Sequence, residues 1–292
     1  MDFACKVLLS WMVVLAGCQR TPAPSDAHAD APPAVAAQAR IVAAGSSVTE
    51  TIYALGAGAD LVGVDSSSLF PEAATKLPQI GYQRTLAAEG ILALQPSLVL
   101  VSGEAGPPTV FEQLRGAGVR VEVIAGEQTV EAGEARIRRI AELVGRDATP
   151  VIAQLDADLA RAQQQREQHT SRPKVIVLYA HSANTVHVFG RNTPAETLLQ
   201  LAGAENAVSG FEGPKPLTPE ALAKAAPDAI LLPTRALERV GGIAGLLQVP
   251  GVALTPAAAA KRIVTFDDTL LLGFSPRTGQ AAIELGAKLA AP

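Results

Sequence analysis

The chain has 292 residues, of which 48% are hydrophobic and 18% are charged, a composition that excludes a largely disordered protein and allows two folded domains of ordinary size. Its 24 Lys and Arg and 28 Asp and Glu give a formal net charge of −4 and are spread along the chain. Because no basic stripe is present, a nucleic-acid partner is not expected.

The N-terminus has the pattern of an export signal over residues 1–17. Lys6 precedes an apolar segment from Val7 to Ala16, which is shorter than the roughly 20 residues needed to span a bilayer. The sequence LAGC, which ends at Cys18, resembles the lipobox of bacterial lipoproteins. That resemblance implies cleavage before Cys18, a lipid on its thiol, and an extracytoplasmic protein anchored to a membrane. The alternative is ordinary signal cleavage further on, after the segment 27–29.

Residues 18–39 are rich in Pro, Ala and Asp without an apolar period, which is typical of an extended tether. The two cysteines, Cys5 and Cys18, both lie before the first predicted strand. The folded part therefore has no thiol, which excludes disulfides, zinc-thiolate sites, iron–sulfur clusters and a cysteine nucleophile.

From residue 40 to 147 the pattern predicts an α/β lobe in which short β-branched runs alternate with helices. The expected strands are 41–45, 61–65, 97–102 and 119–124, and the expected helices cover 49–58, 89–95 and 108–118. Residues 128–170 carry no strand signal. They predict a helix that ends near Val144, followed by a linker helix of about twenty residues, from Thr149 toward Thr170, within a linker domain of residues 148–172.

A second α/β lobe is predicted for residues 173–292. Strands are expected at 174–180, 228–233 and 262–266, and helices over 193–203, 219–225 and after Pro276. The two halves also resemble each other, because Glu89 and Glu220 are each followed seven residues later by a proline and then a strand. Two similar lobes joined by one helix predict a ligand groove between them.

Common catalytic and nucleotide-binding motifs are absent from the sequence. Ser46 and Ser47 follow the first strand, and they either cap a helix or, in a serine hydrolase, supply a nucleophile. No histidine is linked to either serine by the sequence, which argues against a hydrolase. We therefore expect a binding protein and not an enzyme.

Tyr82 is the strongest candidate for a ligand-binding residue. It follows Gly81 in a turn-like segment, so its ring is expected on a loop and not on a periodic apolar face. In an extended segment Tyr82 and Arg84 project to the same side, and a guanidinium beside a phenol favours the phenolate. A phenolate is a hard anionic ligand suited to ferric iron.

The segments GYQRTLAAEGILALQP and GRNTPAETLLQLAGAENAVSGFEGPKPLTPEALAKAAPDAILL resemble the hemin-binding periplasmic proteins of bacterial haem ABC importers, over essentially everything from Arg40 onward. The wider group includes cobalamin and siderophore binders and has two α/β lobes joined by a long helix. The resemblance implies that Tyr82 is the axial iron ligand, with Arg84 at the arginine of the motif.

The resemblance also implies contacts from the second lobe. His181 is at the place of a second-lobe histidine that follows a strand, although Ser182 follows it where the family has glycine, so His187 is the alternative. Arg235 matches an arginine that approaches the ligand. Each of these residues could instead be an ordinary surface or core residue.

Glu89 and Glu220 match the glutamate pair that meets arginines on two permease subunits, and both would also favour a helix N-terminus. These resemblances together imply a monomeric, lipid-anchored haem-binding protein that delivers haem to an ABC permease and its ATPase. The alternatives are cobalamin or a ferric siderophore as cargo on the same fold, with Tyr82 as a stacking aromatic, and the serine hydrolase.

Overall fold

The computed structural model describes residues 39–126, 129–168, 171–182 and 185–290. These described residues belong to one compact unit. The predicted signal peptide, Cys18 and the tether lie outside the described residues, and their assignment stays a prediction. Within the described part, no helix is both long and apolar enough to cross a membrane.

The first lobe is built on a parallel sheet of β1 (Ile41–Ala44), β2 (Leu61–Val64), β3 (Leu98–Ser102) and β4 (Arg120–Ile124), in the order β2-β1-β3-β4. Its two central strands are buried on both faces. Ile41 and Ala43 pack with helices α1 (Ser46–Ala54) and α5 (Val130–Val144), whereas Val42 and Ala44 pack toward α3 (Ala88–Leu92) and α4 (Pro108–Gly116). A sheet covered on both faces explains the continuous apolar strands of the sequence.

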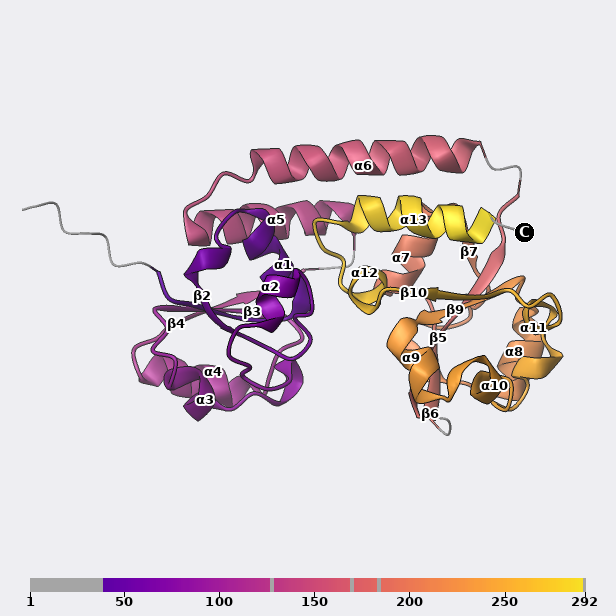
Figure 1. Ribbon diagram of the computed structural model, residues 1–292, viewed down its shortest axis with the longest axis horizontal. Coiled ribbons are helices and arrows are strands. Elements are labelled where there is room, and N and C mark those ends of the chain that lie inside the picture. The colour runs from indigo at the N-terminus through magenta and orange to yellow at the C-terminus, as the bar shows by residue number, and fades with distance from the viewer. Residues whose placement is uncertain (1–38, 127–128, 169–170, 183–184, 291–292) are drawn as a thin grey trace, which may run out of the picture. The chain divides into compact units, whose positions relative to one another are not determined.

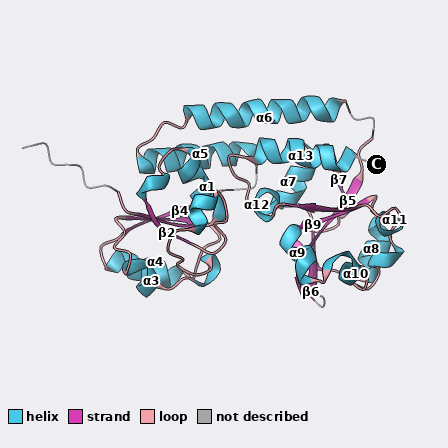
Figure 2. Ribbon diagram, viewed as in Figure 1, coloured by secondary structure: helices cyan, strands magenta, loops and turns pink. Residues whose placement is uncertain are grey.

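The second lobe has a mixed sheet (Figures 1 and 2). Its parallel part is β10 (Ile263–Phe266), β9 (Ala229–Pro233) and β5 (Lys174–Ser182), with β7 (Glu205–Asn206) pairing with the start of β5. Two antiparallel strands, β6 (Thr185–Phe189) and β8 (Pro214–Pro216), continue the sheet. The sequence prediction missed both. In β6 the alternation of buried Val186 and Val188 with more exposed neighbours was the available signal.

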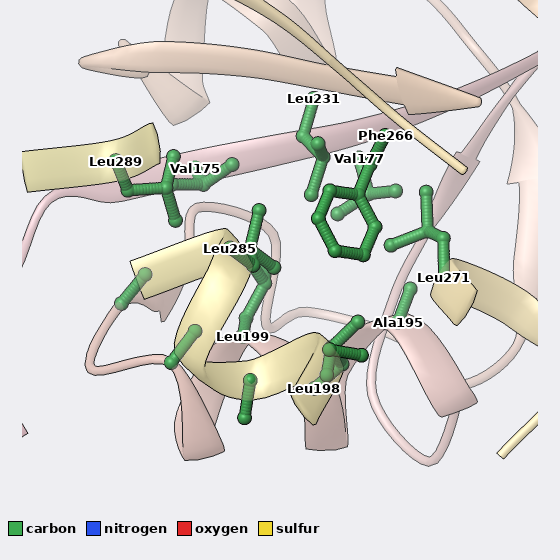
Figure 3. Close-up of a cluster of buried hydrophobic side chains, with 14 of the residues drawn as sticks. Val175, Val177, Ala195, Leu198, Leu199, Leu231, Phe266, Leu271, Leu285 and Leu289 are labelled. Atoms are coloured by element: carbon green, nitrogen blue, oxygen red, sulfur yellow. The ribbon is translucent and has the colours of Figure 1, made fainter. Parts of the chain in front are cut away.

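Two helices close one face of the second sheet. Leu198 and Leu199 of α7 (Pro194–Leu201) and Leu285 of α13 (Thr278–Ala290) pack against Val177 and Phe266 from the strands, as Figure 3 shows. The opposite face of the sheet packs against the helices between residues 219 and 259, which lie before β9 and between β9 and β10 in the sequence. The second lobe therefore has its own hydrophobic core.

Helix α6 (Thr149–Glu167) lies between the two sheets in the sequence and contributes to both cores. Ile152 and Leu155 belong to the core of the first lobe, and Ala162 belongs to that of the second. The helix packs closely on α13, since a Cβ placed on Gly279 would lie 2.6 Å from the Cβ of Asp158. The span expected for the linker helix is thus helical from Thr149 to Glu167.

Shorter elements complete the described chain: η1 (Gly58–Asp60), α2 (Glu72–Thr75), η2 (Gln83–Thr85), α8 (Pro219–Ala225), α9 (Thr234–Arg239), α10 (Gly242–Leu246), η3 (Val252–Leu254), α11 (Pro256–Ala259) and α12 (Asp268–Leu272). The predicted two-lobed α/β fold is confirmed. The predicted domain boundaries and the ligand groove between the lobes stay predictions.

Candidate ligand-binding site

Tyr82 lies on the connection between α2 and α3, directly before η2 and on a loop as the sequence predicted. Gly81 precedes it with a φ of 93°, in the left-handed region that favours glycine. The carbonyl of Gly81 accepts a hydrogen bond of 2.8 Å from the amide of Ser66, just beyond β2. Tyr82 itself has an extended backbone and is 46% exposed, so its ring is available to a ligand.

The turn that follows Tyr82 is fixed to the carboxyl end of the first sheet. The Ser102 hydroxyl at the end of β3 donates to Gln83 Oε1 at 2.6 Å, and the Gly106 amide donates to the Gln83 carbonyl at 2.9 Å. A Cβ on Gly45, directly after β1, would lie 2.7 Å from Ser102 Cβ and 3.1 Å from Gln83 Oε1. Ligands of open α/β sheets bind at this edge, and these hydrogen bonds hold the turn beside Tyr82 there.

Arg84 does not stand beside Tyr82 in an extended segment, and that part of the prediction is wrong. Residues Gln83–Thr85 form a 3₁₀ turn, in which residues two apart do not share a side. The Arg84 guanidinium instead forms an ion pair with Glu104, and both side chains are 56% exposed. Glu104 was missed because it is 20 residues away and no local pattern links the two residues.

The expectation that His181 follows a strand is wrong. Strand β5 extends to Ser182, so His181 lies inside it, where the pairing with β6 changes register between Ala180 and Ser182. Such irregularities are frequent next to binding sites. The alternative, His187, lies on β6 opposite Tyr179. The choice between the two histidines stays open.

Arg235 is the second residue of α9, which directly follows β9 at the carboxyl end of that strand. Its amide donates to Asp268 Oδ2 at 3.3 Å, and Asp268 follows the neighbouring strand β10. Burial raises the pKa of the Asp268 carboxyl, with smaller opposing contributions from the hydrogen bond to that amide and from the charge of Arg235. The two residues line a cavity of about 480 Å³ together with Glu238, Asp267 and Lys288, among others.

Glu89 and Glu220 occupy matching places in the two lobes. Each lies in the first turn of a short helix, α3 and α8 respectively, and each is exposed. The expectation that both glutamates open a helix is confirmed. Their docking role stays a prediction.

Ser46 and Ser47 begin helix α1, but neither caps it. The N-cap is Gly45, whose amide donates to the buried Asp65 carboxylate at 2.8 Å. The capping role considered for these serines is therefore wrong.

Comparison with known proteins places the chain in a family. A family model described as "Periplasmic binding protein" matches residues 41–270, most of the chain. The chain belongs to the periplasmic binding protein family. The predicted family resemblance is thereby confirmed, and the family consists of substrate-binding proteins, not enzymes.

Two solved structures resemble this periplasmic binding protein over nearly their whole length. The periplasmic heme-binding protein RhuT from Roseiflexus sp. RS-1 is 42% identical with a TM-score of 0.84, and the alignment covers 86% of this chain and 97% of RhuT. The periplasmic heme-binding protein BhuT, solved with two hemes, is 40% identical with a TM-score of 0.81 and the same coverage.

Curated relatives are more distant and match over a smaller part of their length. An ABC transporter substrate-binding lipoprotein, YvrC of Bacillus subtilis strain 168, is 27% identical over 66% of this chain and 62% of its own length. A vitamin B12-binding protein of Pectobacterium atrosepticum is 27% identical over 66% of this chain and 71% of its own length. These relatives support an extracytoplasmic location for this periplasmic binding protein.

Proposed function

We propose that this protein captures haem outside the cytoplasm and delivers it to an ABC importer. One observation carries the proposal: Tyr82, within the motif GYQRTLAAEG, is exposed on a turn that is fixed to the carboxyl edge of the first sheet. The similarity to two heme-binding proteins at 40% identity or more supports haem as the cargo.

In this proposal Tyr82 supplies a phenolate oxygen to Fe(III) of the porphyrin. The phenol loses its proton as it binds, because coordination to a cation favours the anionic form. The hydrogen-bonded turn lowers the cost of binding, since less of the backbone beside Tyr82 has to be ordered when the ligand arrives. His181, or alternatively His187, is the proposed ligand from the second lobe.

Arg84 and Arg235 are the cations proposed for the haem propionates. Arg84 already pairs with a carboxylate, that of Glu104, in an exposed ion pair. Such surface pairs contribute only about 0–1 kcal/mol, so a propionate can replace Glu104 at little cost. A guanidinium suits this exchange because it offers paired donors to a carboxylate.

Hand-off to the permease is assigned to Glu89 and Glu220, one on each lobe. Both are exposed in the first turn of a helix. A negative charge is favourable at that end of a helix because of the helix dipole. Arginines on two permease subunits would match them in charge. Lipid on Cys18 would keep the monomeric protein close to that permease and its ATPase.

Cobalamin is the alternative cargo, because curated relatives include vitamin B12-binding proteins. In that case Tyr82 would stack on the ligand and would not coordinate a metal. The higher identity to heme-binding proteins, over nearly their whole length, favours haem.

The two cargoes are distinguished by titrating the purified protein with hemin and, separately, with cyanocobalamin while the absorbance spectrum is recorded. We expect saturable changes in the Soret and ligand-field bands with hemin, and no saturable binding of cyanocobalamin. Saturable binding of cyanocobalamin, with only nonspecific uptake of hemin, would contradict the haem proposal.

A further inference from the structure

An ion pair with a buried carboxylate connects residues 227 positions apart in the sequence. Glu50 on α1 is 3% exposed, and it accepts hydrogen bonds from Arg277 Nε at 2.9 Å and from Arg277 Nη2 at 2.7 Å. The Ser275 hydroxyl also donates to Glu50 Oε1. The carboxylate is thus satisfied on both oxygens by the segment that leads into α13.

The two sides of this ion pair belong to different lobes. Ile52, on the same helix as Glu50, is part of the hydrophobic core of the first lobe. Leu270 and Leu271, just before Ser275, are part of the core of the second lobe. The Glu50–Arg277 pair therefore joins the two lobes at a point separate from helix α6.

Further contacts surround the ion pair. The Arg277 guanidinium lies over the ring of Phe70 at 3.4 Å from its centroid. Arg136 of α5 donates from Nη2 to the Phe274 carbonyl at 2.8 Å and lies 5.8 Å from the centre of the Phe274 ring. Phe274 has a φ of 46°, a left-handed conformation that a non-glycine residue keeps only where its surroundings impose it.

This group of residues is connected through helices α1 and α12 to the two candidate ligand contacts. On one side, α1 begins next to Gly45, which packs against Gln83, the neighbour of Tyr82. On the other side, α12 precedes Phe274 and begins at Asp268, which accepts the hydrogen bond from the Arg235 amide. Helix α1, the Glu50–Arg277 ion pair and helix α12 thus connect the Tyr82 turn to the start of α9.

We propose that five residues, Glu50, Phe70, Arg136, Ser275 and Arg277, form a clasp that fixes the separation of the two lobes. They are positioning residues for ligand binding and do not touch the ligand. A buried carboxylate in a bidentate contact with a guanidinium allows little movement of the lobes. Any separation of the lobes at this point would leave the carboxylate buried without its partner. The clasp would hold the site in a preformed geometry before the ligand binds. Only the predicted effect on hemin affinity rests on the proposed function.

The proposal is tested by measuring the distance between the lobes with spin labels. Cys5 and Cys18 are the two cysteines of the chain, so replacing both with serine leaves introduced cysteines as the sole labelling sites. Glu112 on α4 and Lys224 on α8 are exposed positions, one on each lobe, at which to introduce them. We expect one narrow distance distribution with an intact clasp, unchanged when hemin is added.

Two clasp variants are compared in this background. Arg277→Lys keeps the charge but loses the two-pronged contact, and Glu50→Gln with Arg277→Met removes both charges so that neither is left buried alone. We expect a broadened or shifted distance distribution in both, and hemin affinity lowered by about tenfold because the lobes must then be ordered on binding. Circular dichroism verifies that each variant is folded.

Asp60→Asn is the matched control, since Asp60 pairs with Arg146 at 3.2 Å within the first lobe. It should leave the distance distribution unchanged. A distribution identical to that of the intact clasp in both folded variants would overturn the proposal. If the protein bound no hemin at all, the proposed function would fail, but the distance measurement would still decide on the clasp.

Discussion

The ion pair between Arg84 and Glu104 gives a prediction about single residues. Their ion pair is exposed on both sides, so its net contribution to stability is small. If Arg84 binds a haem propionate, Glu104 competes with that propionate. We expect Glu104→Gln to strengthen hemin binding by roughly 1.5- to 5-fold, the equivalent of about 0.2–1 kcal/mol for an exposed ion pair. An absorbance titration with hemin measures it.

Glu122→Gln is the control for this variant. Glu122 also pairs with arginines on the first lobe, Arg120 and Arg139, but it lies on β4 and not beside the Tyr82 turn. It should leave hemin affinity unchanged. Weaker hemin binding by Glu104→Gln would show that the ion pair holds Arg84 in place and does not compete with the ligand.

Asp268 provides a prediction about stability and pH. Burial raises the pKa of the Asp268 carboxyl in the folded protein. Between the unfolded and the folded pKa, the folded chain therefore binds more protons than the unfolded chain. In that pH range the stability of the fold falls as pH rises. Asparagine has no charge to bury. Asp268→Asn should therefore raise the Tm at pH 7.5, and the gain should shrink as pH is lowered through the folded pKa toward about 3.9.

Asp147→Asn is expected to behave in the opposite way. The Thr149 amide lowers the pKa of the Asp147 carboxyl by donating a hydrogen bond, so the ionised group stabilises the fold above its unfolded pKa. This variant should lower the Tm at pH 7.5 and approach the parent protein in acid. Thermal melting followed by circular dichroism compares both variants, and a lower Tm for Asp268→Asn at pH 7.5 would contradict the burial argument.

Single residues were predictable where a local pattern identified them. The motif around Tyr82 predicted a loop tyrosine, and the tyrosine lies on a loop. The partners of Gln83 and Arg84, namely Ser102 and Glu104, could not be predicted, because tertiary folding and not the local sequence brings them to the turn.

Helices α3 and α8 present the docking prediction at the level of elements. Glu89 and Glu220 are exposed charges on matching helices, and charges at an interface rim mostly govern encounter and orientation with a partner. Glu89→Arg and Glu220→Arg should each lower haem uptake into cells or proteoliposomes that carry the permease. Hemin affinity should remain within about twofold of the parent, because a rim charge contributes little to it.

Glu112→Arg is the control for docking, since Glu112 is an exposed glutamate on α4 of the first lobe. Uptake should be normal in that variant. Loss of hemin binding by Glu89→Arg or Glu220→Arg would place these residues in the ligand site and would remove the docking role.

Most elements of the parallel sheets were predictable, because buried strands such as β3 and β9 are continuous apolar segments beside prolines. The antiparallel strand β8 was not, since its sequence Pro-Lys-Pro is exposed and carries no apolar alternation. The 3₁₀ turn after Tyr82 was also missed, and it invalidated the extended geometry expected for Arg84.

At the scale of the whole molecule, the sequence indicated two lobes through its internal similarity, and each lobe has its own hydrophobic core. What joins the lobes was only partly predictable. A long helix has a local signature, whereas the Glu50–Arg277 pair links residues from opposite ends of the folded chain and has none.

The central claim is that Tyr82 binds ferric haem, and one comparison tests it most directly. Hemin is titrated into the parent protein and Tyr82→Phe, and the Soret and ligand-field bands are followed. Phenylalanine keeps the ring and removes only the oxygen, so hemin should bind at least about tenfold more weakly, the equivalent of about 1.4 kcal/mol, with altered ligand-field bands. Tyr53→Phe, in helix α1, should bind as the parent does. Parent affinity and an unchanged spectrum in Tyr82→Phe would contradict the account.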